Sequence, residues 1–291
     1  MTNKKTYQMT ITTIMIIVSL VCVVPFILLI SSSVTSEEML VKNGYSFWPQ
    51  KIDLSAYKYL LFGSQSVIRG YLISVIVTVA GTLLSLILTI LFAYPLSRRD
   101  LPGRNFFAFF IFFTMLFNGG LVPTYIMWTQ MFHIKNTLWA LIFPNLLMNA
   151  FNIIMVRTYF MTSIPEEVIE AARIDGSGEF RILFGIVVPM ALPIIITVTL
   201  LVGLGYWNDW LNGLYYINND KYYSIQVLLT KMLENVEMVK KASSAGASAM
   251  KMPSTSIRMA VAVIGALPVL AVYPFFQRYF VKGIVIGAVK G

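Results

Sequence analysis

Few side chains in this chain of 291 residues have a type and spacing suited to chemistry. There is one histidine, His133, and one cysteine, Cys22, which lies within an apolar stretch. No nucleophile, base and acid form a set typical of covalent catalysis, and no Cys/His spacing suits a metal. No Gly-Lys dipeptide occurs, so the phosphate-binding loop of an ATPase is missing. The sequence therefore indicates a non-enzymatic protein that binds no metal and no cofactor of its own.

The densest cluster of charge lies between two apolar stretches. Ser163 and Glu166 have the spacing of a capping box, and Gly176 is a typical helix stop. Glu166 and Glu167 suit the positive end of the helix dipole. The sequence therefore predicts a short helix over 164–176, too short and too charged to cross a bilayer.

This short helix has two possible roles. Glu170 is spaced to pair with Arg173 at i, i+3, which is typical of an interfacial helix packed on its own bundle. Alternatively, the helix offers a surface to another protein, because small side chains on one face allow close approach. That face is predicted to hold Val168, Ala171, Ala172 and Asp175.

The elements around this helix are apolar. Hydrophobic residues make up 57% of the chain and charged residues 12%, against about 25% charged in ordinary soluble domains. Six charge-free stretches each hold the ~20 apolar residues that span a membrane. Continuous apolar runs favour helices over barrel strands, which alternate. The sequence predicts an all-α integral membrane protein with six transmembrane helices within 6–36, 70–97, 105–134, 136–156, 182–208 and 259–277.

Basic residues in short loops orient these spans. The loop Ser97–Arg104 has three basic residues, whereas the opposing loop 118–135 has only Lys135, and the terminal tails are basic without acids. The positive-inside rule then places both termini in the cytoplasm. The net charge of +9 is interpreted as membrane topology and lipid contact, because nucleic-acid binding needs a concentrated basic face.

One motif resembles a known family. Glu170-Ala171-Ala172, three residues, Gly176, nine residues and then Ile186 and Pro189 are similar to the EAA loop of ABC-importer permeases. Val188 departs from the pattern, because Leu is usual there. Other stretches extend the resemblance over about 10–291, to maltose-type sugar permeases and their complex-oligosaccharide branch: Ala93–Arg98, Phe117–Thr124, Tyr273–Gly283 and Gly287–Gly291.

The resemblance implies a type I ABC-importer (MetI-like) fold with a cytoplasmic coupling helix in a bacterial cell membrane. The chain would pair as a heterodimer with a second permease subunit, with two cytoplasmic ATPase subunits that bind the ATP, and with an extracellular or periplasmic solute-binding protein. The substrate would be a sugar, moved by alternating access. The residues expected to couple the permease to the ATPase are Glu166, Glu167, Glu170, Ala171, Ala172, Asp175 and Gly176.

Candidate substrate contacts come from two spans. Asn145, Asn149 and Asn152 fall at i, i+4 and i+7, so a continuous helix would put three amides on one face. They either line the pathway and bind sugar hydroxyls or join helices by hydrogen bonds. Trp207, Asn208 and Asp209 offer a ring face and polar groups, although Trp also anchors helices at the interface.

The chain divides into residues 1–66, with the tail, first span and outer loop, and a permease core, 67–291. The core contains the coupling loop 162–189 and an outer loop 213–255, in which Ser224–Lys240 is predicted to be helical. This outer loop, or loop 33–66, is expected to contact the binding protein.

Other solutes, such as a polyamine, phosphate or peptide, stay open as substrates. An ion-coupled transporter is disfavoured, because the spans hold no acid except Asp209 at one end.

Overall fold

The computed structural model describes residues 2–62, 65–244 and 255–288, and the side chains of 6–60, 65–234 and 255–275. These residues form helices joined by turns and irregular segments, with an isolated bridge between Thr35 and Ile52. The helices are α1 (Thr2–Ser33), α2 (Glu37–Asn43), α3 (Ser55–Phe62), α4 (Gln65–Ser97), α5 (Arg104–Leu116), α6 (Leu121–Ile126), η1 (Met127–Met131), α7 (Trp139–Ile142), α8 (Ala150–Ser163), α9 (Glu166–Ile174), α10 (Glu179–Ile182), η2 (Leu183–Val187), α11 (Val188–Met190), α12 (Leu192–Asn208), α13 (Leu211–Tyr216), η3 (Asp220–Tyr222), α14 (Ile225–Ser244) and α15 (Thr255–Ala288).

The chain forms two compact units. The first comprises Met1–Ile68 and Leu228–Pro268, and the second comprises Arg69–Val227 and Val269–Gly291. In the first unit, the carboxylate of Glu37 accepts hydrogen bonds of 2.7–3.0 Å from the backbone N–H groups of Thr255 and Ser256. A negative charge at the start of α15 satisfies the free N–H groups there and complements the helix dipole.

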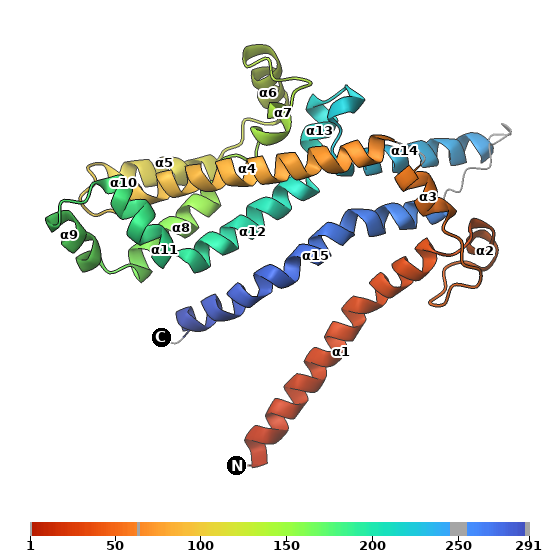
Figure 1. The fold of residues 1–291 in the computed structure, drawn as a ribbon, viewed down its shortest axis with the longest axis horizontal. Helices are drawn as coiled ribbons and strands as arrows, with labels where there is room; N and C mark the ends of the chain where they lie inside the picture. Colours follow the sequence, from red (N-terminus) through yellow and green to blue (C-terminus); the bar gives the residue numbers. More distant parts are fainter. Residues whose placement is uncertain (1, 63–64, 245–254, 289–291) are drawn as a thin grey trace. The chain divides into compact units, whose positions relative to one another are not determined.

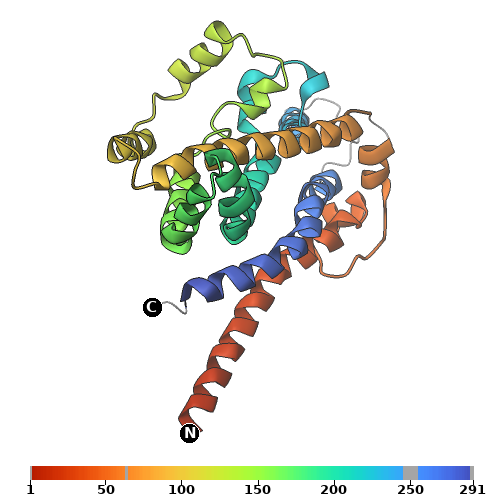
Figure 2. The ribbon, with the colours of Figure 1, turned by 60° about the vertical axis from the view of Figure 1, so that its left-hand side comes forward.

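The helix α1 in the first unit is apolar all round, and Figure 2 shows it as one long helix. Ile14, Ile17 and Val21 are all more than half exposed. A helix that is apolar on every side is buried in a protein core or in a bilayer. This all-round apolar surface agrees with a helix that is long and apolar enough to cross a bilayer.

The membrane spans agree only in part with the six predicted. Three described helices are long and apolar enough to cross a bilayer, namely Thr6–Ser33, Gln65–Ser97 and Thr255–Phe275. Two bent pairs raise the number to five if each is one span. The pairs are Arg104–Leu116 with Leu121–Met131, bent by 109°, and Glu179–Met190 with Leu192–Asn208, bent by 85°.

The predicted span over 136–156 is not a continuous helix. It contains α7, an irregular segment and the start of α8. Pro144 has no backbone N–H to continue a helix, and Asn145 has a left-handed φ of 63°. Asn149 is extended and caps α8, since its side chain accepts from the backbone N–H of Asn152. Absence of charge predicted an apolar segment correctly, but it did not reveal these helix-ending residues.

The second unit packs its helices around α4. Figures 1 and 2 show α8 and α12 on one side of α4 and α6 on the other. The core between them holds Ala93, Val156, Ile182 and Val198, each with no exposed surface. Gly81 lets α12 approach closely, because a Cβ there would lie 2.5–2.8 Å from three ring carbons of Tyr206. Small residues at helix contacts are typical of membrane proteins, where packing replaces the hydrophobic effect.

The helix predicted over Ser224–Lys240 is confirmed. The pattern over Ser224–Lys240 predicted a helix, and α14 covers Ile225–Ser244. Within the predicted outer loop 213–255, residues 245–254 lie outside the described residues.

Candidate functional site

The short charged helix predicted between two apolar segments is confirmed as α9. Its first turn carries Glu166 and Glu167 and its last turn Arg173, so the charges complement the helix dipole at both ends. The predicted capping box is wrong, because Ser163 is the last residue of α8 and the N-cap is Pro165. A residue before proline is held extended, as Ile164 is, so the helix cannot begin earlier.

The C-terminal end of α9 has the predicted glycine stop. Gly176 has φ 75°, in the left-handed region, and its N–H bonds to the carbonyl of Arg173 at 3.0 Å. The N–H of Ser177 bonds to the carbonyl of Ala172 at 3.0 Å. These two bonds form a Schellman motif, which satisfies the last carbonyls of a helix and turns the chain sharply.

The two faces of α9 differ in exposure. Ile169 and Ala172 are buried in the core of the second unit, which fixes the helix to the bundle. The predicted small-residue face therefore needs correction, because Ala172 points inward and cannot contact another protein directly. The outward side chains are Glu167, Val168, Glu170, Ala171, Arg173, Ile174 and Asp175, while Glu166 is half-buried and lies 3.4 Å from the Arg99 side chain.

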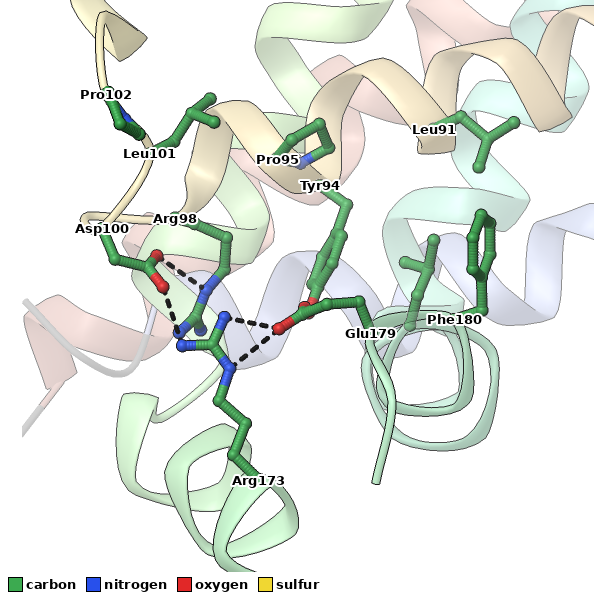
Figure 3. A pocket seen from close by; sticks show the side chains of 11 residues that line it. Leu91, Tyr94, Pro95, Arg98, Asp100, Leu101, Pro102, Arg173, Glu179 and Phe180 are labelled. Atoms are coloured by element: carbon green, nitrogen blue, oxygen red, sulfur yellow. Dashed lines mark hydrogen bonds and ion pairs between the residues drawn. The ribbon is translucent and has the colours of Figure 1, made fainter. Parts of the chain in front are cut away.

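The side chain of Arg173 joins three elements, in a cluster that we call the charged junction. Its Nη1 donates to Asp100 Oδ2 at 2.7 Å, in the turn between α4 and α5. Its Nε and Nη2 donate to Glu179 Oε1 at 2.8 and 2.6 Å, at the start of α10. Glu179 Oε2 accepts from the Tyr94 hydroxyl at 2.6 Å, in the last turn of α4. Arg98 Nε lies 3.5 Å from Asp100 Oδ1 and completes the junction (Figure 3).

The predicted pair between Glu170 and Arg173 is therefore absent. The guanidinium turns to Asp100 and Glu179 instead, since one planar fork can bind two carboxylates. Glu170 is exposed and has no polar partner among the described side chains.

The contacts in the charged junction shift the pKa values of its side chains. The hydrogen bond from Arg173 holds the pKa of Asp100 below its usual range. The same carboxylates raise the pKa of Arg173, so its positive charge is permanent. The side chains of Arg173, Asp100 and Glu179 are 37%, 51% and 51% exposed. Because water competes at such exposures, each pair contributes only about 0.2–1 kcal/mol to stability.

The charged junction borders a cavity of about 390 Å³. Its apolar wall comes from Leu91, Pro95, Leu101, Phe180 and Leu183 (Figure 3). No group of three or more His, Cys, Asp or Glu side chains in the described part of the chain has a metal-binding arrangement. The cavity thus lies between the end of α4 and α10, beside the residue that links them to α9.

The three asparagines predicted on one helix face do not share a helix. Asn145 is exposed in the irregular segment, and Asn149 is exposed and caps α8. Asn152 lies within α8 and is 6% exposed. The predicted common face is wrong because the i, i+4, i+7 argument holds only along an unbroken helix.

The residues predicted at the end of α12 lie together. Trp207 is buried, with its ring centroid 6.1 Å from that of Tyr71 on α4. The amide of Asn208 donates to the carbonyl of Leu204 at 3.0 Å. Asp209 Oδ1 accepts from the N–H of Asn212 at 3.2 Å. Burial raises the pKa of Asp209 above its usual range.

A second polar contact, the buried junction, ties this region to the irregular segment. The Tyr206 hydroxyl donates to the carbonyl of Ile142 at 2.9 Å, and Asn212 Nδ2 donates to the carbonyl of Pro144 at 2.9 Å. Both side chains are at most 3% exposed. Tyr206 and Asn212 lie in the same aromatic and polar stretch as the predicted residues Trp207, Asn208 and Asp209, but their contacts with the irregular segment were not predicted.

The partners of Arg173 were not predicted from the sequence either. One signal was present, because Asp100 is the sole acid between Asp53 and Glu166. A lone carboxylate in a long apolar region needs a cation as a partner. Its contact with Arg173 spans 73 positions, which helix periodicity does not address.

Comparison with known proteins agrees with this geometry. The family described as "Binding-protein-dependent transport system inner membrane component" matches residues 85–286. The polygalacturonan/rhamnogalacturonan transport system permease protein YtcP of Bacillus subtilis (strain 168) is 38% identical, covering 99% of this chain and all of that protein. Protein LplC of the same strain is 36% identical, covering 94% of this chain and 91% of that protein.

A solved structure also matches. It is the crystal structure of a bacterial ABC transporter involved in the import of the acidic polysaccharide alginate, with a TM-score of 0.81 and 30% sequence identity. The match covers 95% of this chain and 97% of that chain, so the two share an all-helical membrane permease fold. This chain therefore belongs to the inner membrane components of binding-protein-dependent transport systems, the multi-pass, non-catalytic permease subunits of ABC transporters, which work with an ATPase and a solute-binding protein.

Proposed function

We propose that this chain is a permease subunit of an ABC importer for oligosaccharides, driven through α9 by a cytoplasmic ATPase. The observation that carries the proposal is the structure of α9. It is a helix of nine residues between two apolar segments, fixed by an apolar inner face and ended by a Schellman turn at Gly176. Its outer face presents acidic and small side chains that the rest of the described chain leaves uncovered.

In this mechanism α9 is the coupling helix. Glu167, Glu170, Ala171 and Asp175 contact the ATPase, and Glu166 and Ala172 hold the helix to its own subunit. Closure of two ATPase subunits on ATP, which they bind, displaces α9 and turns the permease from inward-open to outward-open. A second permease subunit forms the other half of the pathway, as a heterodimer. Gly176 allows the chain to turn into α10 without strain.

The proposed topology places both termini in the cytoplasm of a bacterial cell, with six crossings. Three crossings are interrupted helices in this topology: the two bent pairs within 104–131 and 179–208, and the region 136–163. The proposed division is an N-terminal region, 1–66, and a permease core, 67–291, although Leu228–Pro268 of that core belongs to the same compact unit as Met1–Ile68. The binding protein contacts loop 213–255 or loop 33–66, in which Tyr45, Phe47 and Trp48 are exposed.

The substrate class is proposed from the relatives and the polar residues. YtcP is named for polygalacturonan and rhamnogalacturonan, and the solved transporter imports alginate, so acidic oligosaccharides are the first class to test. Trp207, Asn208 and Asp209 stay the proposed contacts at the end of α12. The Trp207 ring is buried beside Tyr71, so the exposed Asn208 is the residue to test first. Asn145, Asn149 and Asn152 contribute to the pathway separately rather than as one stripe.

The test uses the complete transporter in liposomes. Two substitutions probe α9, namely Glu170→Gln and Gly176→Val, and Arg181→Gln is the control, because Arg181 is an exposed charge in α10 without a polar partner among the described residues. We expect loaded binding protein to stimulate the ATPase of the wild type, and both α9 variants to lose uptake relative to the control.

Normal uptake by both α9 variants would contradict the coupling role. Oligogalacturonate and a neutral oligosaccharide of equal length separate the substrate classes. Stimulation by a polyamine, phosphate or peptide instead of either sugar would contradict the proposed substrate.

A further inference from the structure

One guanidinium in α9 binds carboxylates from two different elements. Arg173 contacts Asp100, in the turn that ends α4, and Glu179, which begins α10. Glu179 also accepts from Tyr94, so the α10 contact leads back to α4. The side chain therefore links the short helix to both apolar segments that flank the cavity.

One other ion pair holds α9, between Glu166 and the Arg99 side chain at 3.4 Å, but the Arg99 side chain is 78% exposed. The buried attachments of α9 are of a different kind. Ile169 and Ala172 pack apolar surface, which resists separation but has no preferred direction. Arg173 uses three N–H groups from a planar fork, at 2.6–2.8 Å, and such a fork fixes the angle between the groups that it binds. The charged junction thus sets the orientation of α9 relative to α4 and α10.

We propose that Arg173 is a positioning residue for transport, which makes the coupling helix and the ends of α4 and α10 move as one body when the ATPase closes. The inference rests on the proposed function, in which the ATPase displaces α9. The Arg173 side chain makes two sets of contacts, which we call its arms. One arm binds Asp100, and the other binds Glu179, which in turn binds Tyr94. Without Arg173, α9 still binds the ATPase, but its displacement is taken up by rotation at Ile169 and Ala172.

The exposure of the junction separates this role from a purely structural one. The side chains of Arg173 and Glu179 are 37% and 51% exposed, so water solvates either one if the other is removed. Asp100 retains Arg98 at 3.5 Å when Arg173 is replaced. Substitution of Arg173 therefore leaves no unpaired charge in the core, and the variant is expected to fold.

The first experiment compares Arg173→Ala with Arg181→Ala in the reconstituted complete transporter, with its binding protein, partner permease and ATPase. Both substitutions remove one arginine from the same loop, but Arg181 has no polar partner among the described residues. We expect solute uptake per ATP hydrolysed to fall at least about fivefold for Arg173→Ala, the lower end of typical coupling between sites. Arg181→Ala should match the wild type.

Two further variants test how Arg173 acts. Arg173→Lys keeps the charge but reaches one arm at a time, so it should restore part of the uptake per ATP. Glu179→Gln should lower the same ratio, and Arg173→Ala with Glu179→Gln should lose little more than Arg173→Ala alone, because residues of one network are not additive. Additive losses, or a ratio for Arg173→Ala equal to that of Arg181→Ala, would overturn the proposal.

A second experiment needs no solute. Spin labels at Val168 in α9 and Pro102 in the turn after α4, in a Cys22→Ser background, report the distance between the two elements. In the wild type we expect the distance to stay the same with and without ATP, and in Arg173→Ala to change or broaden. Equal distributions in both proteins would overturn the role of Arg173. In the first experiment, by contrast, a wild type that imports none of the oligosaccharides would overturn only the proposed substrate.

Discussion

The charged junction and the buried junction hold parts of the same compact unit together by opposite means. In the charged junction, ionised side chains meet at exposures up to 51%. In the buried junction, Tyr206 and Asn212 donate to backbone carbonyls at exposures of at most 3%. Hydrogen bonds removed from water are costly to leave unmade, while exposed ion pairs exchange readily with solvent. The first arrangement suits a contact that transmits motion, and the second suits a fixed framework.

Two aspartates show the same contrast. Asp100 has a lowered pKa because Arg173 hydrogen-bonds its charged form. Asp209 has a raised pKa because burial disfavours its charged form more than its hydrogen bonds favour it. The pKa of an aspartate is therefore shifted in opposite directions in the two regions. A specific partner lowers it in one region, and loss of water raises it in the other.

The largest effect is expected from crowding the framework. In Gly81→Ala the new methyl group would meet the Tyr206 ring, which cannot move away because its hydroxyl is bonded to Ile142. Overpacking of this kind costs about 1–3 kcal/mol. The thermal midpoint in detergent should fall clearly. Gly178→Ala is the control, since a Cβ there meets nothing within 4 Å. Equal midpoints for both variants would show that the buried region is not rigid.

A smaller loss is expected from removing one buried bond. Tyr206→Phe keeps the ring in place and leaves the carbonyl of Ile142 without its donor. The expected cost is about 1 kcal/mol, within the range for a lost hydrogen bond. Stability should fall by the same amount at every pH from 4 to 8, because no ionised group is removed. A loss of stability that depends strongly on pH would show that the buried junction relies on ionised groups, as the charged junction does.

The smallest effect is expected from acid. The pKa of Asp100 in the folded state lies below its unfolded value of about 3.9. The contribution of Asp100 to stability is therefore fully present above pH 4 and is lost as the pH falls through the folded pKa.

Thermal midpoints of wild type and Asp100→Asn, measured from pH 7 to pH 3, test this prediction. The difference should be small near neutral pH, about 0.2–1 kcal/mol for exposed pairs, and should shrink below pH 4. If the difference in stability between the two proteins grew as the pH fell, the pKa of Asp100 would be raised in the folded state and not lowered.

The local features of α9 were predictable from sequence, because they depend on neighbours. The acids of its first turn and the stop at Gly176 followed from residue type alone. The start of α9 was predicted too early, because the Ser163–Glu166 spacing matches a capping box. Ile164, which precedes Pro165, is extended, so the helix begins after Pro165. The family resemblance, carried by Glu170 to Pro189, was confirmed over the whole chain.

Contacts between distant segments were not predictable in the same way. The bond from Arg173 to Asp100 joins positions 73 apart, and that from Asn212 to Pro144 joins positions 68 apart. The asparagine stripe failed because Pro144 and the left-handed Asn145 interrupt the helix on which it depended. The length of a charge-free stretch predicts that the stretch lies in a membrane. It does not show where the helix is interrupted.

The bonds to Ile142 and Pro144 explain how this permease tolerates a broken helix in an apolar region. A peptide carbonyl released from its helix has no water to turn to among hydrocarbon tails, so irregular backbone survives only where protein groups substitute for solvent. Tyr206 and Asn212 supply those groups from another part of the chain. The shape of the segment between α7 and α8 is thus encoded more than sixty residues downstream, and mutations that reshape it should be sought there.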